Sequence, residues 1–222
     1  MPQRISKKIL IYLFVFFTLV TINNTRISND FYKIKKFNIS GLNKIETSKI
    51  YDDLIIFKDD NIFLFNKKNI SEKIYSNNFV EKFQIFKLYP STLNVEIKKT
   101  KFLAITKKNN KDYLIGENGK LVEIKDTVSK IPFIFGNINV QNFLRFKKTI
   151  DNSNFKFNEI ENLYYFKSNR WDVKTKEGLS LKLPSDLSPQ KLNLIYEIIQ
   201  KKNFSGNKTL DFRQSNMMVI DE

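Results

Sequence analysis

An uncharged, strongly apolar run near the start of the chain constrains its fold more than any other feature. The run ILIYLFVFFTLVTI extends from Ile9 to Ile22, and Arg4, Lys7 and Lys8 precede it. At about 1.5 Å of rise per residue, a helix over this run is roughly 21 Å long. The hydrocarbon core of a bilayer is about 30 Å thick. The apolar cores of signal peptides and short membrane anchors share this length.

The sequence after the run favours an uncleaved anchor over a signal peptide. A cleavable signal ends in small residues of the A-x-A type, whereas TINNTRIS follows the run here without an alanine. Flanking lysines and interfacial polar residues can extend the effective span. We therefore predict a transmembrane signal anchor over residues 9–25, preceded by a cytoplasmic tail of residues 1–8.

Charge does not decide the orientation of this anchor, because basic residues flank it in similar number on both sides: Arg26, Lys33, Lys35 and Lys36 follow it. The lengths of the two flanking segments decide the orientation instead. The tail is too short to form a domain, whereas long domains that follow an anchor are translocated largely regardless of charge. We predict a cytoplasmic N-terminus, with the bulk of the chain outside the cytoplasm.

The absence of two residue types excludes much chemistry. The 222 residues include no histidine and no cysteine. Without thiols there is no disulfide, thiolate nucleophile or zinc-thiolate site. Without histidine, the commonest general base and metal ligand is missing. We predict no enzyme activity, no catalytic residue, no metal and no cofactor.

The net charge of +15 suggests an acidic partner, such as nucleic acid or an anionic membrane. Only five of the 38 basic residues are arginine, however, and readers of bases and phosphates favour the guanidinium group. The single alanine, Ala104, and the abundance of Lys, Asn, Ile and Phe indicate AT-biased coding. We predict no nucleic-acid partner.

Other candidate sites have simpler interpretations. The carboxylate pairs Asp52/Asp53 and Asp59/Asp60 lie in polar contexts near lysines, which favours a solvated surface over acid–base catalysis. The segment GENG lacks the residues of a phosphate-binding loop and is typical of a β-turn. Ser185 and Ser188 have no histidine as a base, and a Ser–Lys dyad stays open without a motif that supports it.

Residues 26–100 predict a first compact unit. YKIKKFNISG alternates as a strand, NKIETSKIYDDLI and NKKNISEKIYSN have helical spacing, and FVEKFQIFKLYP and STLNVEIKK are strands. Thr47 or Ser48 is the expected N-cap of the first of these helices. The order β-α-α-β-β predicts a sheet with helices on one face.

Residues 101–222 predict a second unit, a mostly antiparallel β domain with flanking helices. DYLIGENGKLVEI is a hairpin, with Asn118 and Gly119 suited to positive φ. IPFIFGN and EIENLYYFK predict strands, and VQNFLRFKKTI predicts a helix. LSPQKLNLIYEIIQKK is a second helix, capped by Ser188. The whole chain is thus expected to be α+β.

The most regular hairpin contains the only tryptophan of the chain. In RWDVKTKEGLSLKLP, Trp171 and Val173 share one face of a strand, and Leu181 lies on the returning strand. Gly178 fits the left-handed position of a three-residue turn. We predict that Trp171 belongs to the core.

Four segments resemble the bacterial FtsQ/DivIB cell-division family. FNISGLNKI resembles its opening strand, VEKFQIFKLYPSTLNVEIKKTKFLAI its V-x-x-A-x-V-x-R-x-x-P-x-T-L stretch, RWDVKTKEGLSLKLP its R-W-x-L hairpin and LDFR its V-D-L-R strand. Together they cover the chain in order behind one anchor. Departures are Phe83 for a small residue, Lys87 for arginine, and Thr100 and Leu103 for the glutamate and proline of E-x-x-P.

The resemblance implies an anchor helix, a POTRA domain, a β domain and a non-enzymatic divisome scaffold. It implies a place in the cell inner membrane at the division septum, with most of the chain in the periplasm. The implied partners are an FtsB-like and an FtsL-like protein, and the FtsB-like protein adds a strand to the edge of the β domain. The implied binding residues are Gln214, Ser215, Asn216, Met217, Met218, Val219 and Ile220, together with Arg170.

The residues themselves agree with an exposed edge. SNMMVI contains neither lysine nor proline, which commonly protect edge strands, and the printed sequence ends soon after it. An ordinary terminal strand is the alternative for this segment. For the whole chain, the alternatives are an envelope POTRA protein that binds polypeptides through the first unit, and a cell-wall enzyme.

Overall fold

The computed structural model describes residues 7–22, 29–124, 131–202, 204, 208–214 and 218–221. Helix α1, Lys7–Ile22, contains the apolar run and has 16 residues. Among the helices in these ranges, none has both the length and the apolar character needed to cross a membrane.

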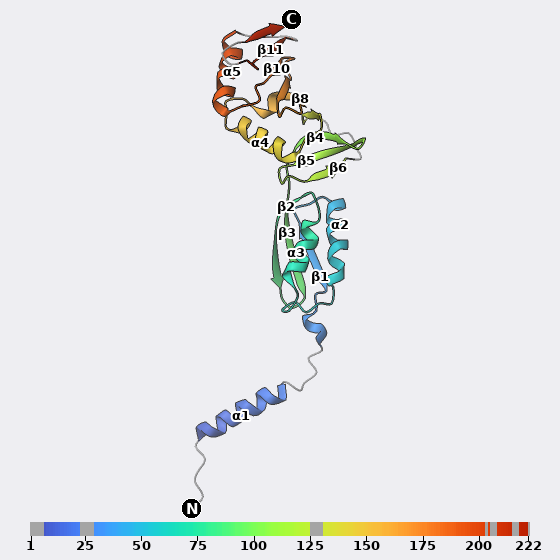
Figure 1. Cartoon of the computed structure of the whole chain (residues 1–222). Coiled ribbons are helices and arrows are strands. Elements are labelled where there is room, and N and C mark those ends of the chain that lie inside the picture. Colours follow the sequence, from blue (N-terminus) through green and yellow to red (C-terminus); the bar gives the residue numbers. More distant parts are fainter. Residues whose placement is uncertain are drawn as a thin grey trace, which may run out of the picture.

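The first unit has the predicted order β-α-α-β-β. Its elements are the 3-10 helix η1 (Asn29–Tyr32), β1 (Lys36–Ser40), α2 (Lys44–Leu54), the 3-10 helix η2 (Ile55–Phe57), α3 (Lys67–Tyr75), β2 (Val80–Leu88) and β3 (Thr92–Lys99). The sheet order is β1-β3-β2, with β1 parallel and β2 antiparallel to β3. Both helices cover one face of this sheet (Figure 1).

Alternation along the strands and helical spacing produce one core between these layers. Ile50 and Leu54 of α2 and Ile70 and Ile74 of α3 are fully buried against strand residues, among them Phe37, Leu93 and Val95. Gly41 ends β1 at φ +90°, where a Cβ atom would lie 1.9 Å from the carbonyl oxygen of Ile97. Only glycine fits at this close approach between the end of β1 and the backbone of β3.

The predicted N-cap of α2 is wrong. The helix begins four residues before Ser48, because Asn43 accepts a hydrogen bond from the backbone N–H of Glu46 at 2.9 Å. The Glu46 carboxylate accepts in turn from the Asn43 N–H, which completes a capping box. Thr47 and Ser48 therefore lie inside the helix.

The second unit is built on one nine-stranded sheet in the order β12-β11-β10-β9-β8-β7-β4-β5-β6. Its strands are β4 (Phe102–Lys108), β5 (Lys111–Gly116), β6 (Leu121–Glu123), β7 (Phe133–Phe135), β8 (Ile160–Tyr165), β9 (Trp171–Thr175), β10 (Ser180–Lys182), β11 (Thr209–Asp211) and β12 (Val219–Asp221). Pairings are antiparallel except β4–β7, β7–β8 and β10–β11. The 3-10 helix η3 (Phe157–Glu159) precedes β8.

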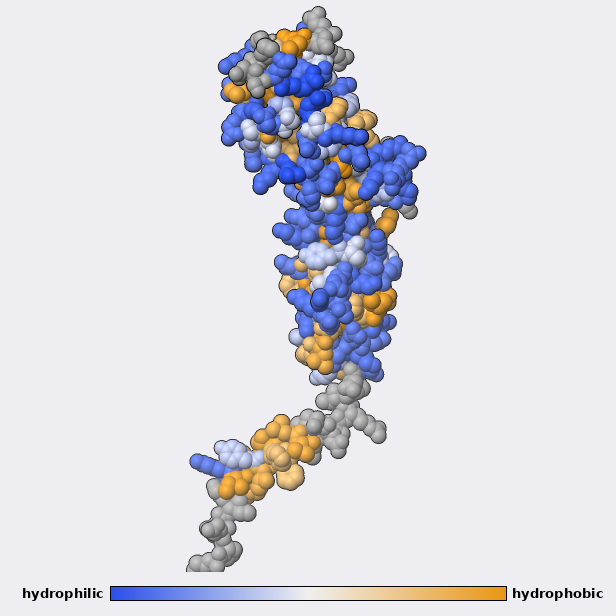
Figure 2. All heavy atoms as spheres, in the orientation of Figure 1, coloured by the Kyte–Doolittle hydropathy of each residue, from blue (hydrophilic) through white to orange (hydrophobic). Residues whose placement is uncertain are grey.

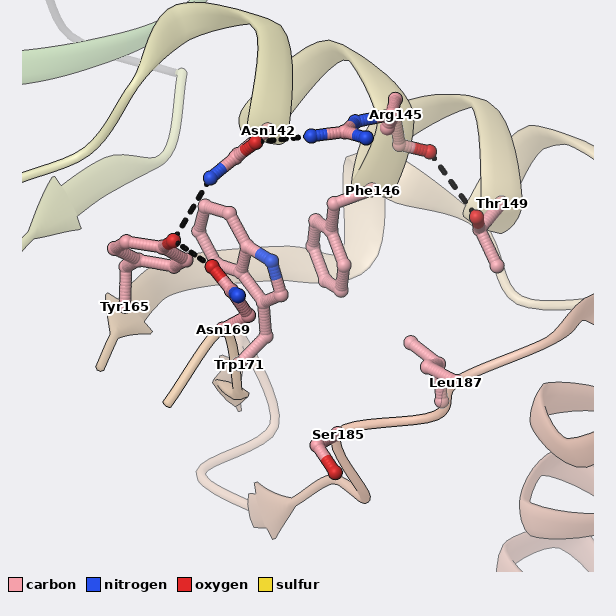
Figure 3. Close-up of a pocket in the computed structure, with 9 residues that line it drawn as sticks. All are labelled: Asn142, Arg145, Phe146, Thr149, Tyr165, Asn169, Trp171, Ser185 and Leu187. Carbon is pink, nitrogen blue, oxygen red and sulfur yellow. Dashed lines mark hydrogen bonds between the residues drawn. The ribbon is translucent and has the colours of Figure 1, made fainter. Parts of the chain in front are cut away.

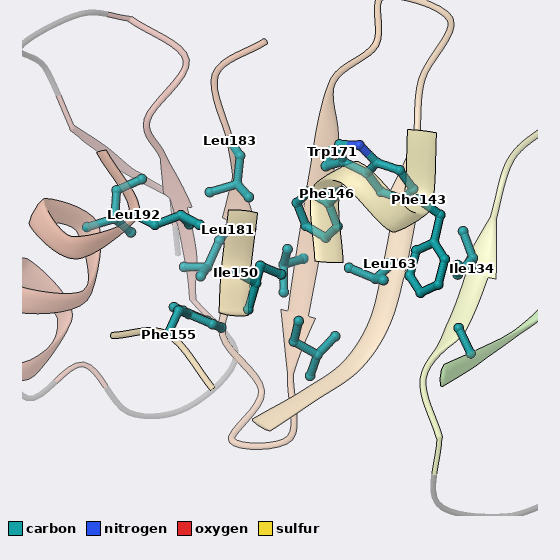
Figure 4. Close-up of a cluster of buried hydrophobic side chains, with 14 of the residues drawn as sticks. Ile134, Phe143, Phe146, Ile150, Phe155, Leu163, Trp171, Leu181, Leu183 and Leu192 are labelled. Carbon is teal, nitrogen blue, oxygen red and sulfur yellow. The ribbon is translucent and has the colours of Figure 1, made fainter. Parts of the chain in front are cut away.

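Two helices, α4 (Val140–Asp151) and α5 (Pro189–Lys202), contribute to the core of the second unit. Figure 4 shows Phe143, Phe146 and Ile150 of α4 against Leu163 and Trp171, with Leu192 of α5 near Leu181 and Leu183. The Phe146 and Trp171 rings stack with centroids 4.5 Å apart. Trp171 is 6% exposed, which confirms its predicted place in the core. Gly178 adopts φ +92°, as the hairpin turn requires.

The two units meet through the GENG turn. The Asn118 side-chain amide donates to the carbonyl oxygens of Asn78 and Val80 at 2.9 and 3.0 Å. Asn78 donates to the Leu121 carbonyl at 2.7 Å, and Val122 packs against the core of the first unit. Gly119 has the predicted positive φ, but Asn118 does not. The Gly119 N–H donates to the Gly116 carbonyl at 3.0 Å, so Asn118 is a central residue of the turn and Gly119 takes the left-handed position after it.

Candidate binding edge

Strand β12 forms one edge of the large sheet. It pairs antiparallel with β11, with Val219 opposite Asp211 and Ile220 opposite Leu210, and within the described residues no strand lies on its other side. Val219 is 53% exposed and Ile220 is 43% exposed. Figure 1 shows this edge at the end of the second unit farthest from the first unit.

The structure describes part of the predicted binding segment. Gln214 is exposed after β11, while Ser215, Asn216 and Met217 lie outside the described residues. Met218 precedes the strand and packs, half-buried, against the core, instead of lying within the strand as predicted. The strand extends further than predicted, to Asp221.

A row of charged residues crosses the sheet to this edge on the face opposite the helices. The register aligns Asp172 of β9 with Lys182 of β10, Lys182 with Asp211 of β11, and Asp211 with Val219. Their neighbours Val173, Leu181 and Leu210 are buried on the helix side. Because side chains alternate along a strand, the row lies on the open face.

Arg170 lies just before β9, so two strands separate it from β12. Its guanidinium Nε is 3.2 Å from Asp172 Oδ1, and its Cζ is 4.2 Å from the centre of the Phe166 ring. Arg170 therefore belongs to the charged row and is held by contacts within the chain. The structure does not bring it into contact with β12.

The two aspartates of the row titrate differently. Hydrogen bonds from Arg213 lower the pKa of Asp211 below its ordinary value; the Arg213 Nε lies 2.8 Å from Asp211 Oδ2. Burial raises the pKa of Asp172, and the nearby Arg170, Arg213 and Lys182 only partly offset it. Asp172 is thus the carboxylate of the row that holds its proton more tightly than usual.

The sequence pattern singled out Arg170 as a candidate but did not single out Asp172, Lys182, Asp211 or Arg213, which lie beside it on the same face. The signal was present, because each of these residues alternates with a buried apolar neighbour. Alternation along one strand does not reveal the register between strands. That register places the charged residues of β9, β10 and β11 side by side.

A groove of about 480 Å³ opens on the helix side of the same sheet, lined partly by Phe146, Trp171, Ser185 and Leu187. In Figure 3, Asn142, Tyr165 and Asn169 form a hydrogen-bonded chain at its rim. Asn142 Nδ2 donates to the Tyr165 hydroxyl at 2.8 Å, and that hydroxyl donates to Asn169 Oδ1 at 2.6 Å. Because these polar groups bind one another, their hydrogen bonds stabilise the fold around the groove.

One member of the carboxylate pairs, Asp53, has a structural contact. Asp53 accepts a hydrogen bond from the buried Asn77 side chain at 2.7 Å, which ties α2 to the end of α3. Among the described residues, no three acidic side chains gather as a metal site would require.

Models of two known protein domains match most of the chain. Residues 32–99 match the POTRA domain, FtsQ-type, and residues 104–215 match the C-terminal domain of cell division protein FtsQ/DivIB. The second match ends before β12.

Individual relatives carry the same names. The cell division protein DivIB of Staphylococcus aureus (strain NCTC 8325) is 36% identical over 91 residues, which are 41% of this chain and 21% of that protein. FtsQ of Rickettsia bellii is 25% identical over 198 residues, 86% of this chain and 73% of that protein. The alignment thus spans about a fifth of the staphylococcal protein.

A solved structure of the major extracytoplasmic domain of DivIB from Geobacillus stearothermophilus aligns with a TM-score of 0.35 and 14% identity. It covers 49% of this chain and 99% of that one. The two domain matches follow one another in the order of the two sheets, and together they take in nearly every element from η1 to β11. The chain therefore belongs to the FtsQ/DivIB family of cell division proteins.

Proposed function

We propose that this protein is a non-enzymatic divisome scaffold that recruits an FtsB-like and FtsL-like pair by β-strand addition to β12. The observation that carries the proposal is the outer side of β12, which pairs with no strand among the described residues and whose exposed residues Val219 and Ile220 offer no lysine or proline protection. A strand added there would pair with the outward-facing backbone groups of β12 and extend the sheet.

The charged row would give the added segment its specificity. A partner that continues past β12 onto the open face meets Asp211 and Arg213 first, and then Lys182 and the Arg170–Asp172 pair. An acidic partner residue that reaches Arg170 would compete with Asp172 for the guanidinium. Such complementarity affects specificity and association rate more than affinity.

The same proposal includes a place in the cytoplasmic membrane at the division septum. The apolar side chains of α1 are exposed along the helix, as Phe14 at 71% and Leu19 at 63% illustrate, and Figure 2 shows it as a hydrophobic segment. A lipid environment would bury these side chains. The proposed division is a tail of residues 1–8, an anchor of residues 9–25, a POTRA domain of residues 26–100 and a β domain of residues 101–222.

Proline substitutions in β12 test the edge. Successive backbone N–H groups of a strand point to opposite sides, so one of Val219 and Ile220 directs its N–H outward and the other toward β11. We expect one of Val219→Pro and Ile220→Pro to weaken partner binding about tenfold, equivalent to about 1.4 kcal/mol, without lowering thermal stability. Binding is measured with the full chain in nanodiscs and a labelled FtsB-like partner.

Val219→Thr is the matched control, because threonine keeps the N–H and suits a strand. Its binding should stay near that of the native chain. Undiminished binding by both proline variants would refute strand addition at β12.

A second candidate, an envelope protein that binds polypeptides through the first unit, is favoured by one observation. Among the described residues, the nine-residue strand β2 pairs only with β3 and forms an edge of the first sheet, longer than the three-residue β12 edge. Gln84→Pro and Ile85→Pro apply the same test there. Loss of partner binding in the β2 variants, with normal binding in the β12 variants, would favour this second candidate.

A further inference from the structure

One end of the first unit collects exposed aromatic and aliphatic side chains. Strands β1 and β3 are parallel and begin at this end, and β2, which is antiparallel to β3, ends there. Helix α3 also begins there, since its opposite end, at Tyr75, contacts Lys120 of the second unit. Helix η1 lies at the same end, so the chain enters the unit there from the direction of α1 (Figure 1).

Four of these side chains form what we call the aromatic cap. Leu64 is 83% exposed, Tyr89 59%, Phe31 54% and Phe63 50%. They come from three separate segments: η1, the loop before α3 and the turn between β2 and β3. Figure 2 shows hydrophobic side chains at this end of the unit. An exposed apolar cluster of this kind marks an interaction surface.

The cap is held in place by defined contacts. The Phe63 and Tyr89 rings stack with centroids 4.8 Å apart, and Tyr32 packs edge-on to Phe63 at 5.3 Å. Beneath the rings, the Ile62 N–H donates to the Tyr32 carbonyl and the Lys35 N–H to the Ser91 carbonyl, both at 2.8 Å. The three segments therefore present the cap together.

The charges around the cap are mainly positive. Lysines at the same end outnumber the aspartates; the lysines are Lys33, Lys35, Lys36, Lys58, Lys67, Lys68 and Lys87, and the aspartates are Asp30, Asp59 and Asp60. Aromatic rings surrounded by basic residues are typical of surfaces that lie at the headgroup level of a membrane. Lysines that lie near an anionic leaflet are attracted to its surface charge.

Chain length brings this surface close to α1. Seven residue steps join Ile22, the last residue of α1, to Asn29, the first of η1. A fully extended chain covers at most about 25 Å in seven steps. If α1 inserts in a bilayer, Asn29, two residues before Phe31 of the cap, lies within that distance of the end of α1 whatever the path between them.

We propose that the aromatic cap, Phe31, Phe63, Leu64 and Tyr89, docks on the surface of an anionic lipid bilayer. This inference rests on the membrane attachment in the proposed function and goes beyond it. Docking at this end would place the first unit directly on the membrane. The β12 edge, at the far end of the molecule, would then be held at a fixed distance from the membrane surface, where a partner can bind it.

Single-cysteine labelling of the full chain tests the proposal, because the native chain has no cysteine. A polarity-sensitive NBD dye is attached in separate variants at Leu64→Cys in the cap, Leu194→Cys on α5 and Phe14→Cys on α1. Each protein is reconstituted at less than one copy per vesicle, in phosphatidylcholine alone and in an equimolar mixture with phosphatidylglycerol. Emission wavelength and quenching by aqueous iodide are measured.

We expect the Leu64 dye to be blue-shifted and several-fold less quenched than the Leu194 dye, with a larger difference in the anionic vesicles. Adding Phe63→Ser and Tyr89→Ser should return the Leu64 dye to the behaviour of the Leu194 dye. Equal quenching of the Leu64 and Leu194 dyes would overturn the proposal. Protection that appears only when several copies share a vesicle would also overturn it, because the surface would then bind a second copy.

The Phe14 dye separates this inference from the membrane anchor. A protected Phe14 dye with an exposed Leu64 dye refutes the cap and leaves the anchor intact. An exposed Phe14 dye with a protected Leu64 dye refutes the anchor and supports the cap. Exposure of both dyes refutes both.

Discussion

Asp172 lies in the charged row between Arg170 and Lys182, where burial raises the pKa of its carboxyl group. The native chain therefore binds this proton more tightly than the unfolded chain does. By linkage, the contribution of Asp172 to stability falls as pH rises from the ordinary aspartate range through the raised pKa. Asp211 behaves oppositely, because hydrogen bonds lower its pKa and its contribution is lost as pH falls through that lowered value.

We expect Asp172→Asn to remove the part of the pH dependence that Asp172 causes. The free energy of unfolding of the variant, relative to the native chain, should rise as pH increases above the ordinary aspartate range. Urea unfolding of both proteins at a series of pH values measures this difference. A difference that does not change with pH would show that Asp172 titrates normally.

Single residues with a local conformational requirement were predictable. The positive φ of Gly178 and of Gly119 follows from turn chemistry, and the core position of Trp171 follows from alternation. The positive φ predicted for Asn118 was wrong, because the hydrogen bond from the Gly119 N–H to the Gly116 carbonyl forms a turn in which only Gly119 takes the left-handed position. The cap of α2 was predicted wrongly, since several residues there can cap a helix and only Asn43 has its glutamate three positions later.

Helix α4 shows how one element is fastened to the sheet. Its Phe146 ring is 4% exposed and stacks on Trp171 at 4.5 Å. We expect Phe146→Ala to destabilise the second unit by about 3–5 kcal/mol, because it removes a large buried ring and leaves a cavity. Urea unfolding measures the loss, and Trp171 emission should shift to longer wavelength as water approaches the indole.

Leu194→Ala is the matched control for this truncation. Leu194 is 61% exposed on α5, so its removal should change stability by no more than about 0.5 kcal/mol. A similar loss in both variants would contradict a specific role for the Phe146–Trp171 stack.

At the level of elements, long segments with a clear period were predicted well. Helices α3, α4 and α5 and strands β2 and β3 lie where spacing and alternation indicated. The bounds of β12 were not predicted, because a three-residue strand has too few positions to show a period. Its ends depend on its pairing with β11.

The junction between the two units affects the whole molecule. The Asn118 side chain spans it with two hydrogen bonds, and Val122 packs across it. We expect Asn118→Ala to weaken the junction by about 1–3 kcal/mol, because the part-buried Val80 carbonyl loses its donor and the exposed bond to Asn78 is lost as well. The unfolding of the two units should then separate into two transitions.

The position of the only tryptophan makes this separation measurable. Trp171 fluorescence reports the second unit alone, whereas far-ultraviolet circular dichroism reports both units. The two transitions should coincide in the native chain and diverge in Asn118→Ala. Asn38→Ala, which removes a hydrogen bond to Asn94 inside the first sheet, is the control and should leave them coincident. Coincident transitions in Asn118→Ala would refute coupling through this residue.

By itself, the sequence determined the apolar N-terminal segment, the β-α-α-β-β order of the first unit, the helices of the second unit and the family resemblance. These are local properties, because the period of apolar residues and the chemistry of turns act over a few positions. The tertiary structure alone decided the order of nine strands, the charged row from Asp172 to Asp211, the junction at Asn118 and the aromatic cap. Each of these joins residues that are distant in the chain, and only the packing of both cores brings them together.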